Sequence, residues 1–252
     1  MSVAVSGAVS GAVHSRVALV TGAGRRVGRA IALDLAAHGW AVAVHHHASA
    51  PGASEVVAQI RDGGGTAAAF AADLTDPAAL EALIPRVMAW SGRVDALVCS
   101  AAGMTRSPIG STTAATVDGI LSLNLRAPFL LAQSAAAHLA EGGAILLIGD
   151  HMADECWPDY AMHGVAKAGV HALTRHLAAA LAPRLRVNAV APGAVLLPDD
   201  GAPQLAERLA AEAALRRIGA PSDVAGAVRY LLDAPFVTGQ VLRVDGGRGL
   251  DA

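Results

Sequence analysis

The chain has few of the residues that mark several common classes of protein. Two cysteines, Cys99 and Cys156, occur in 252 residues, which is too few for a disulfide framework, and neither lies in the spacing of a metal site. No apolar run is long enough to span a bilayer. The formal net charge of −2 provides no basic excess for nucleic acid or an anionic membrane. We therefore expect no metal, nucleic acid or membrane partner.

The first residues also lack a secretory signal. Residues 1–15 are a tract of Ser, Gly, Ala and Val without the basic start that such a signal needs. We interpret them as a flexible arm and expect residues 16–252 to form one domain. Together with the low cysteine content, this favours a cytoplasmic location.

What the chain does contain is an alternation of short β-like and longer helix-like apolar runs. With 54% hydrophobic residues it can fill a sizeable core. Such alternation is typical of an α/β fold with a doubly wound parallel sheet and helices on both faces. The predicted strands are 17–20, 41–45, 66–71, 96–99, 144–148, 185–190 and 241–244. The predicted helices are 29–38, 53–62, 77–90, 113–139, 160–181 and 221–232.

The most informative stretch follows the first predicted strand. Gly22, Gly24 and Gly28 lie in the sequence Thr-Gly-Ala-Gly-Arg-Arg-Val-Gly, just before a predicted helix. Glycines let the backbone approach a ligand, and the unpaired N–H groups of a helix start face an anion. The spacing Gly-x-Gly-x-x-x-Gly departs from the dehydrogenase fingerprint Gly-x-Gly-x-x-Gly, so alone it also fits a turn without a ligand. Between a strand and a helix, it favours a bound dinucleotide.

Further motifs along nearly the whole chain resemble the short-chain dehydrogenase/reductase family. They are Ala-Asp-Leu at 72–74, Ser-Ala-Ala-Gly at 100–103, Asn124, Lys167, Arg-Val-Asn at 186–188, Pro-Gly at 192–193 and Val-Asp-Gly-Gly at 244–247. The resemblance implies a Rossmann fold, a nicotinamide cofactor and a small-molecule substrate. The segments 25–28, 45–49 and 245–248 are most similar to the pteridine and dihydromonapterin reductase branch.

The choice of cofactor can be argued from charge at the end of the second predicted strand. An acidic residue there would accept hydrogen bonds from a free ribose and repel a 2′-phosphate, and none is present. Instead His45, His47 and Ser49 lie there, and Arg25 and Arg26 lie in the glycine turn, so donors and positive charge converge. We therefore predict NADPH as the cofactor.

The histidines at 45–47 have other interpretations. Because neighbouring side chains of a strand point to opposite faces, they also fit a solvated strand end or an adventitious metal site. In the resembling branch a His-Arg-Ser segment contacts the phosphate. Here Ala48 replaces the arginine, which weakens binding of the 2′-phosphate unless Arg25 compensates. By resemblance Asp73 accepts from the adenine amine, although capping the next helix is an equal alternative. The resemblance also assigns to the cofactor Val27, Leu74, Ser100, Ala101, Ala102, Lys167, Pro192 and Gly193.

The catalytic positions depart from the family pattern. In the family a tyrosine lies four residues before a lysine on one helix; the lysine lowers the tyrosine pKa, and the phenol protonates the substrate. Lys167 is in place, but His163 occupies the tyrosine position and Asp150 the position where most members carry serine. The pteridine reductase branch also has aspartate there. Asn124 fits the family's structural asparagine, which holds a water that links the lysine to solvent.

Two side chains compete for the role of proton donor. Tyr160 lies seven residues before Lys167, roughly 10 Å along a helix, which is too far for the ammonium group to tune the phenol. Free histidine titrates near ~6.5 and tyrosine near ~10, so a protonated imidazole at 163 is the stronger acid. Lys167 and the oxidised nicotinamide disfavour a second positive charge, which Asp150 would offset as a relay partner. A further interpretation makes His163 a spacer in a site without chemistry.

The presence of His163 and Asp150 in place of the family's tyrosine and serine affects which substrate the site can reduce. Carbonyl reduction creates a basic alkoxide that needs a donor at the oxygen, whereas a C=N bond can arrive protonated and needs chiefly a hydride and a carboxylate. Asp150 suits the second task, which favours cyclic imines and dihydropteridines. Substrate contacts are expected from Met104, which replaces an aromatic ring of the resembling reductases, and from Trp157 and Val195.

We therefore predict an NADPH-dependent reductase of C=N bonds, with Asp150 and His163 in proton supply and Lys167 on the cofactor ribose. The alternatives are a carbonyl reductase or alcohol dehydrogenase with a displaced acid, and a protein that binds NADPH without catalysis. The resemblance implies a homodimer or homotetramer built on helices 113–139 and 160–181, although these helices could simply pack on the sheet. Segment 192–203 is predicted as a loop above the sheet's carboxyl edge, where ligands bind.

Overall fold

The apolar runs form a seven-stranded parallel sheet in the computed structural model, which describes residues 15–196 and 203–250. The strand order is β3-β2-β1-β4-β5-β6-β7, so the chain winds outward in both directions from β1. The doubly wound Rossmann fold is thereby confirmed. The strands are β1 (Val17–Val20), β2 (Ala41–His46), β3 (Ala67–Ala71), β4 (Ala96–Cys99), β5 (Ala144–Ile148), β6 (Arg186–Pro192) and β7 (Val241–Val244).

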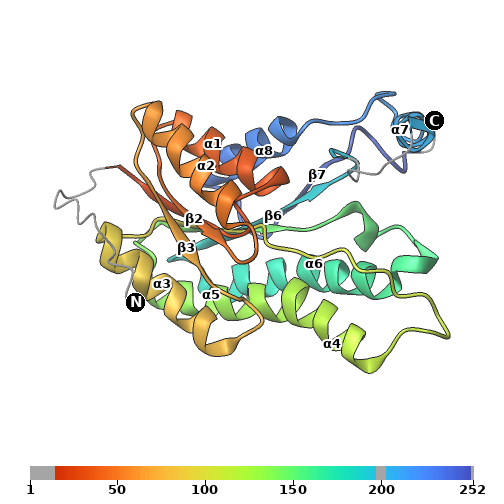
Figure 1. Cartoon of the computed structure of the whole chain (residues 1–252), viewed down its shortest axis with the longest axis horizontal. Helices are drawn as coiled ribbons and strands as arrows, with labels where there is room; N and C mark the ends of the chain where they lie inside the picture. The colour runs from red at the N-terminus through yellow and green to blue at the C-terminus, as the bar shows by residue number, and fades with distance from the viewer. Residues whose placement is uncertain (1–14, 197–202, 251–252) are drawn as a thin grey trace.

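Helices cover both faces of this sheet (Figure 1). On one face lie α1 (Arg26–Ala37), α2 (Ala50–Asp62) and α8 (Pro221–Asp233). On the other lie α3 (Pro77–Ser91), α5 (Ala127–His138) and α6 (Ala161–Leu181), with α4 (Ala114–Leu121) beyond them. Within the described ranges no helix is both long and apolar enough to cross a membrane.

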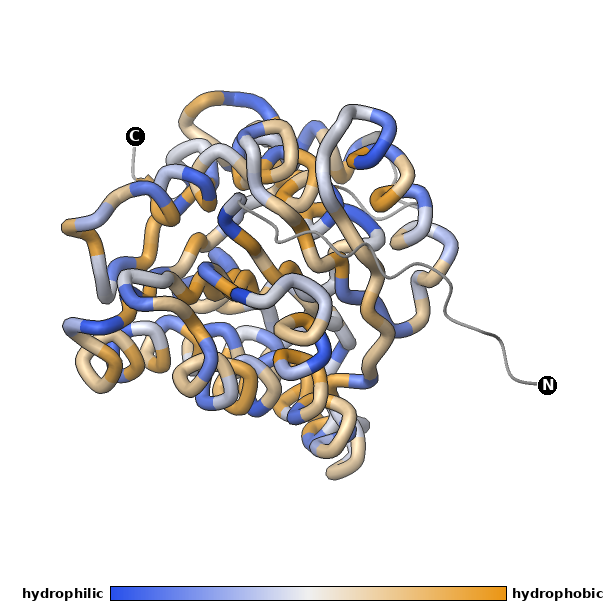
Figure 2. The backbone as a smooth tube through the Cα atoms, turned by 90° about the vertical axis from the view of Figure 1, so that its left-hand side faces the viewer, coloured by the Kyte–Doolittle hydropathy of each residue, from blue (hydrophilic) through white to orange (hydrophobic). Residues whose placement is uncertain are grey.

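Side-chain alternation along the strands divides the core into two layers. In β1, Val17 and Leu19 pack toward α3, α5 and α6, whereas Ala18 and Val20 pack toward α1, α2 and α8. All four residues are fully buried, which accounts for the continuous apolar run of a strand covered on both faces. Figure 2 shows hydrophobic stretches recurring along the central strands and helices, with hydrophilic residues mostly on the outer turns.

The structure corrects three predicted elements. The single helix expected at 113–139 is divided by a π-helical turn, η1 (Ser122–Arg126), between α4 and α5. Tyr160 precedes α6, at the end of a short 3-10 turn, η3 (Pro158–Tyr160). The segment predicted as a loop from 192 begins with the end of β6 and leads to a helix, α7 (Pro203–Ala211). Residues 1–14 of the predicted arm and residues 197–202 of this loop lie outside the described residues.

Candidate active site

A cavity of about 690 Å³ opens at the carboxyl ends of the central strands, where the strand order reverses between β1 and β4. Of the site residues predicted from the sequence, Gly24 and Asn124 alone do not line it. The predicted residues that do are Gly22, Arg25, Arg26, Val27, Gly28, His45, His47, Ser49, Asp73, Leu74, Ser100, Ala101, Ala102, Met104, Asp150, Trp157, Tyr160, His163, Lys167, Pro192, Gly193 and Val195.

The glycine turn has contacts that a larger residue would not allow. Gly22 has a φ of +65°, and a Cβ there would lie 2.9 Å from the Ala101 Cα. A Cβ on Gly28, in the first turn of α1, would lie 2.4 Å from the Gly22 carbonyl oxygen. Gly24 is buried against α2, where a Cβ would lie 2.7 Å from Ser49 Oγ. In the part of the chain that the structure describes, the N-cap residue of α1, Arg25, makes no side-chain cap hydrogen bond, which suits a turn that receives an anion.

His45 supports this turn and has a different role from the predicted one. Its Nδ1 accepts a hydrogen bond from the Gly22 N–H at 3.1 Å, and its Nε2 lies 3.1 Å from the Ala72 carbonyl oxygen, to which it donates. Desolvation by burial lowers the pKa of His45 to about 4. The neutral ring therefore has neither a charge nor a spare N–H for a phosphate, which corrects the prediction that it supplies one.

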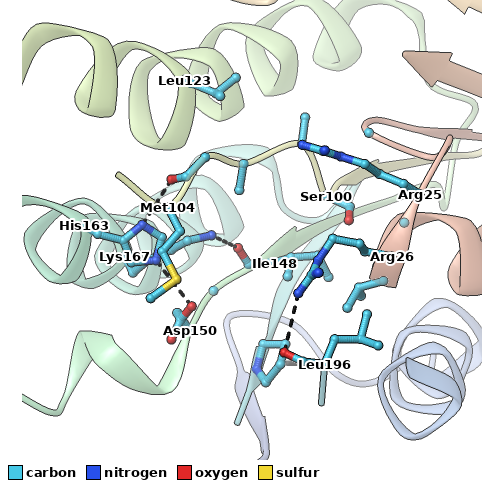
Figure 3. A pocket seen from close by; sticks show the side chains of 18 of the residues that line it. Arg25, Arg26, Ser100, Met104, Leu123, Ile148, Asp150, His163, Lys167 and Leu196 are labelled. Atoms are coloured by element: carbon cyan, nitrogen blue, oxygen red, sulfur yellow. Dashed lines mark hydrogen bonds and ion pairs between the residues drawn. The ribbon is translucent and has the colours of Figure 1, made fainter. Parts of the chain in front are cut away.

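The basic side chains predicted to meet a 2′-phosphate lie at the start of α1. Arg25 and Arg26 are exposed on the wall of the cavity. Arg26 Nη2 donates to the Leu196 carbonyl at 3.4 Å, so this side chain reaches toward the segment after β6 (Figure 3). Ser49, which precedes α2, lies beside the same turn. The cavity thus presents two guanidinium groups and a hydroxyl at the end formed by the glycine turn.

Asp73 is not the helix cap that the sequence left open as an alternative. The cap of α3 is Asp76, whose side chain accepts from the Ala78 N–H. Asp73 instead accepts from the hydroxyl and the N–H of Thr75, at 2.7 and 2.8 Å, and these hydrogen bonds lower its pKa. His47 Nε2 lies 3.9 Å from Asp73 Oδ2 at the exposed rim of the cavity. Asp73 is therefore ionised and faces the cavity from the end of β3.

Three predicted catalytic side chains meet at the inner end of the cavity (Figure 3). Asp150 follows β5, and His163 and Lys167 lie one turn apart on α6, so both point from the same face of that helix. Asp150 Oδ2 lies 3.4 Å from His163 Nε2. Lys167 Nζ donates to the Ile148 carbonyl at 2.8 Å. His163 and Lys167 are 2% and 4% exposed, so these contacts are made away from bulk water.

The imidazole of His163 is placed between two hydrogen-bond acceptors. Its Nδ1 lies 3.2 Å from the Gly103 carbonyl oxygen, and its Nε2 faces the Asp150 carboxylate. A neutral ring carries one N–H and can satisfy only one of these oxygens as a donor. The doubly protonated ring satisfies both. The site therefore places an imidazole between two acceptors at the position where the resembling family has a phenol.

The charges around Asp150 are strongly coupled. Burial opposes ionisation of this carboxyl group, but hydrogen bonds from His151 and His163 and the charge of Lys167 hold its pKa well below the ordinary range. Burial lowers the pKa of Lys167, and the charge of Asp150 opposes that shift. Asp150 is thus an ionised carboxylate surrounded by groups that carry protons.

Asn124 does not line the cavity but bonds to Gly103, which does. Its amide group exchanges two hydrogen bonds with Gly103: Nδ2 donates to the carbonyl at 3.0 Å, and Oδ1 accepts from the N–H at 3.2 Å. Nδ2 also donates at 2.9 Å to the carbonyl of Ile120, in the last turn of α4, from the π-helical turn η1 that contains Asn124. Since the Gly103 carbonyl also faces His163, Asn124 fixes the acceptor that orients the imidazole. The water-mediated role that the resemblance implies for Asn124 stays a prediction.

Tyr160 lies in the same cavity but outside the Asp150–His163 pair. It precedes α6, and within the described residues no hydrogen bond joins its hydroxyl to Asp150 or Lys167. Its ring packs edge-on against Trp157, with centroids 6.3 Å apart. Met104 is exposed, and in Figure 3 its side chain extends toward Asp150. Trp157, Tyr160 and Met104 therefore line the same cavity as the Asp150–His163 pair.

Several lining residues were not predicted. They are Ala48, Thr75, Gly103, Leu123, Ile148, Gly149, His151, Met152, Ala194, Leu196, Leu205 and Leu209. The spacing of Leu205 and Leu209, four residues apart, is a helical signal that could have indicated α7. His151 directly follows Asp150, but alternation predicts that neighbours diverge, so no local pattern indicated that both face the cavity.

Comparison with known proteins assigns the family. A family model described as enoyl-(acyl carrier protein) reductase matches residues 22–248. A hydroxynaphthalene reductase-like protein of Metarhizium brunneum is 34% identical over 251 residues, which cover 92% of this chain and 94% of that protein. The chain belongs to the short-chain dehydrogenase/reductase family. Its coarse function is accordingly that of an NAD(P)-dependent oxidoreductase.

Solved structures of short-chain dehydrogenases/reductases support the same assignment. A dehydrogenase/reductase from Sinorhizobium meliloti is 38% identical, with a TM-score of 0.88, and the match covers 95% of this chain and 96% of that one. A short-chain dehydrogenase from Burkholderia cenocepacia, solved in complex with NADP, is 35% identical with a TM-score of 0.87 and covers 92% and 97%. The finer resemblance to the pteridine reductase branch stays a prediction.

Proposed function

We propose that this short-chain dehydrogenase/reductase is an NADPH-dependent reductase of C=N bonds, acting on a cyclic imine or a dihydropteridine-like substrate. The observation that carries the proposal is the ionised Asp150 carboxylate, held 3.4 Å from the His163 ring at the position where the family's tyrosine is missing. A carboxylate stabilises a positive iminium, and a protonated imidazole supplies a proton to a nitrogen of similar basicity.

The residues of the cavity fit NADPH. A Cβ at Gly22 or Gly28 would clash with neighbouring backbone atoms, so these glycines let the turn approach the cofactor. Arg25 and Arg26 supply positive charge beside the turn. β2 ends in histidine and not in an acidic residue, so nothing there repels a 2′-phosphate. The Burkholderia cenocepacia relative was solved with NADP. When bound, the cofactor supplies the hydride.

The polar side chains have separate tasks in this proposal. Lys167 is buried at the inner end of the cavity and binds the ribose hydroxyls. Asp150 stabilises positive charge on the substrate nitrogen, while the imidazolium of His163 holds the proton for a substrate that arrives neutral. The Gly103 carbonyl keeps the ring oriented at 3.2 Å from its Nδ1. A ketone gains less from this arrangement, because it brings no positive charge for the Asp150 carboxylate to stabilise.

A substrate panel tests the proposal. Purified protein is mixed with NADPH and cyclic imines, dihydropterins or ketones, and the loss of nicotinamide absorbance is followed. We expect turnover of imines or dihydropterins and a drop of roughly 10²-fold or more for Asp150→Asn and His163→Gln. Turnover confined to ketones overturns the assignment. Tight NADPH binding without turnover of any class would instead favour a cofactor-binding protein without catalysis.

A carbonyl reductase is the second candidate, because Tyr160 lines the same cavity and the Metarhizium brunneum relative is named for hydroxynaphthalene reduction. In that case Tyr160→Phe abolishes ketone turnover and His163→Gln leaves it nearly intact. The C=N proposal predicts the reverse order. We also propose a cytoplasmic homodimer or homotetramer with contacts along α4, α5 and α6, which light scattering and fractionation test.

A further inference from the structure

A row of oppositely charged side chains leads from the catalytic pair toward the protein surface. His151 Nδ1 lies 3.0 Å from Asp150 Oδ1, and His151 Nε2 lies 4.0 Å from Glu155 Oε2. Arg248 Nε then binds Glu155 at 2.8 Å, and Arg248 Nη2 lies 2.6 Å from Glu212 Oε2. The side chain of His151 is 10% exposed and that of Glu212 is 40% exposed, so the row connects a buried ring to solvent.

The summed charge of this row and of Lys167 is balanced when one histidine ring carries an additional proton. Three carboxylates, those of Asp150, Glu155 and Glu212, are opposed by two cations, Arg248 and Lys167. With both histidine rings neutral, the group has an excess of one negative charge. One proton on His151 or His163 balances it.

The surroundings of His151 favour its protonated form. Burial disfavours a charge on this ring, but the hydrogen bond to Asp150 and the charges of Asp150 and Glu155 outweigh burial and raise its pKa, with Arg248 opposing them. Its Nδ1 also lies 3.2 Å from the Pro192 carbonyl oxygen, so this nitrogen faces only acceptors. Among the described residues its buried Nε2 has no hydrogen-bond partner and faces Glu155.

The elements packed around His151 contribute no further carboxylate to the row. From α6, His163 and Lys167 are linked to Asp150, and His171 interacts with Asp150 and Lys167 through charge alone. The Trp157 ring packs edge-on at 5.8 Å between centroids, and its Nε1 donates to Glu155 Oε2 at 3.3 Å. Glu155 is therefore held by Trp157 and Arg248 in the position that faces His151.

We propose that His151 and Glu155 return a proton from solvent to the Asp150–His163 pair after each turnover; this inference rests on the proposed C=N reductase function. Reduction of a neutral C=N bond adds one hydride, from the cofactor, to carbon and one proton to nitrogen. An N–H bond of the His163 ring breaks as the substrate N–H bond forms. His151 then passes its Nδ1 proton through Asp150 to His163, which leaves a neutral ring with its proton on Nε2. The ring regains its Nδ1 proton from water, and the Glu155 carboxylate facing Nε2 stabilises the charged ring.

The balance of this step is one proton taken from solvent for each C=N bond reduced. Because the pKa of Asp150 is held well below its ordinary range, the carboxylate passes the proton and the two rings store it. His151 and Glu155 act through Asp150 and are therefore positioning residues. His171 provides a matched control, because it is another buried histidine, on α6, whose Nε2 has no hydrogen-bond partner among the described residues and which forms no ion pair with the row.

Stopped-flow kinetics tests the row under turnover. In His151→Gln we expect the first equivalent of NADPH to be oxidised at the wild-type rate, followed by a steady state slower by roughly 10²-fold with a larger solvent isotope effect. Added imidazole should restore the steady state of His151→Gly. His171→Gln should show no burst. Equal slowing of both phases with an unchanged isotope effect, or no slowing at all, overturns the proposal.

A histidine NMR titration tests the row without any substrate. Glu155→Gln removes the carboxylate that faces His151, so the ring should lose its proton at lower pH than in the wild type. His163→Gln leaves Asp150 to His151 alone, so the ring should lose its proton at higher pH, and His171→Gln should leave the transition in place. A His151 transition unmoved by Glu155→Gln and His163→Gln overturns the row whatever the substrate panel gives, which separates it from failure of the reductase assignment.

Discussion

The substitution Gly28→Ala tests how the glycine turn forms the cofactor site. A Cβ at this position would lie 2.4 Å from the Gly22 carbonyl oxygen, and backbone contacts of this kind are tolerated only from about 3.4 Å, so the turn must move by about 1 Å. Overpacking of this sort costs about 1–3 kcal/mol. If the displaced turn loses that energy in contacts with the cofactor, the NADPH dissociation constant rises about 5- to 150-fold.

The matched control is Gly226→Ala, which lies in α8 where a Cβ meets open space. Both substitutions gain about 1 kcal/mol of helix propensity, so the difference between them isolates the contact with Gly22. NADPH binding is measured by fluorescence titration, and the free energy of unfolding by urea. Gly226→Ala should bind like the wild type and be more stable. Equal NADPH affinity in the two variants would refute the reasoning about the turn.

Three further predictions concern buried groups. Because burial lowers the His45 pKa from 6.5 to about 4, stability is full above pH 6.5 and falls by about 3 kcal/mol toward pH 4. Urea unfolding across this range should show that slope in the wild type and lose it in His45→Gln; matching slopes contradict it. Asn124→Ala leaves the Gly103 N–H without its partner and should lower the free energy of unfolding by about 1–3 kcal/mol, and an unchanged value speaks against this role. Burial raises the Cys99 pKa to about 12, while Cys156 is exposed. Ellman's reagent should therefore label one thiol rapidly in the native protein, and rapid labelling of two thiols would show that Cys99 is not buried.

The strands could be predicted from the sequence almost residue by residue. Each is a short apolar run bounded by turn residues, and burial on both faces requires that pattern; β1, β4, β5 and β7 begin and end where predicted. The helix expected at 113–139 was less predictable. In its π-helical turn Asn124 bonds to Ile120 on the adjoining helix and to Gly103 on another segment, and a contact to another segment leaves no periodic signal.

Within the site, the spacing of residues in the sequence predicted the relative positions of side chains that lie on the same helix. His163 and Lys167 lie four residues apart on α6, so their common face followed from helix geometry. The role of His45 did not, because it depends on the Gly22 N–H and the Ala72 carbonyl, which come from two other segments. A pattern of residue types gives no information on which acceptor a buried ring will meet.

The sequence by itself determined the doubly wound sheet, the glycine turn at its switch point and the unusual pairing of histidine with lysine on one helix. These depend on period and local spacing, which are properties of a single segment. Only the tertiary structure decided that Asp150 is shared by His163 and His151, and that Glu155 and Arg248 continue the row toward solvent. Those contacts join the end of β5, helix α6 and the last residues of the chain, and they exist only once the packed sheet brings these segments to one edge.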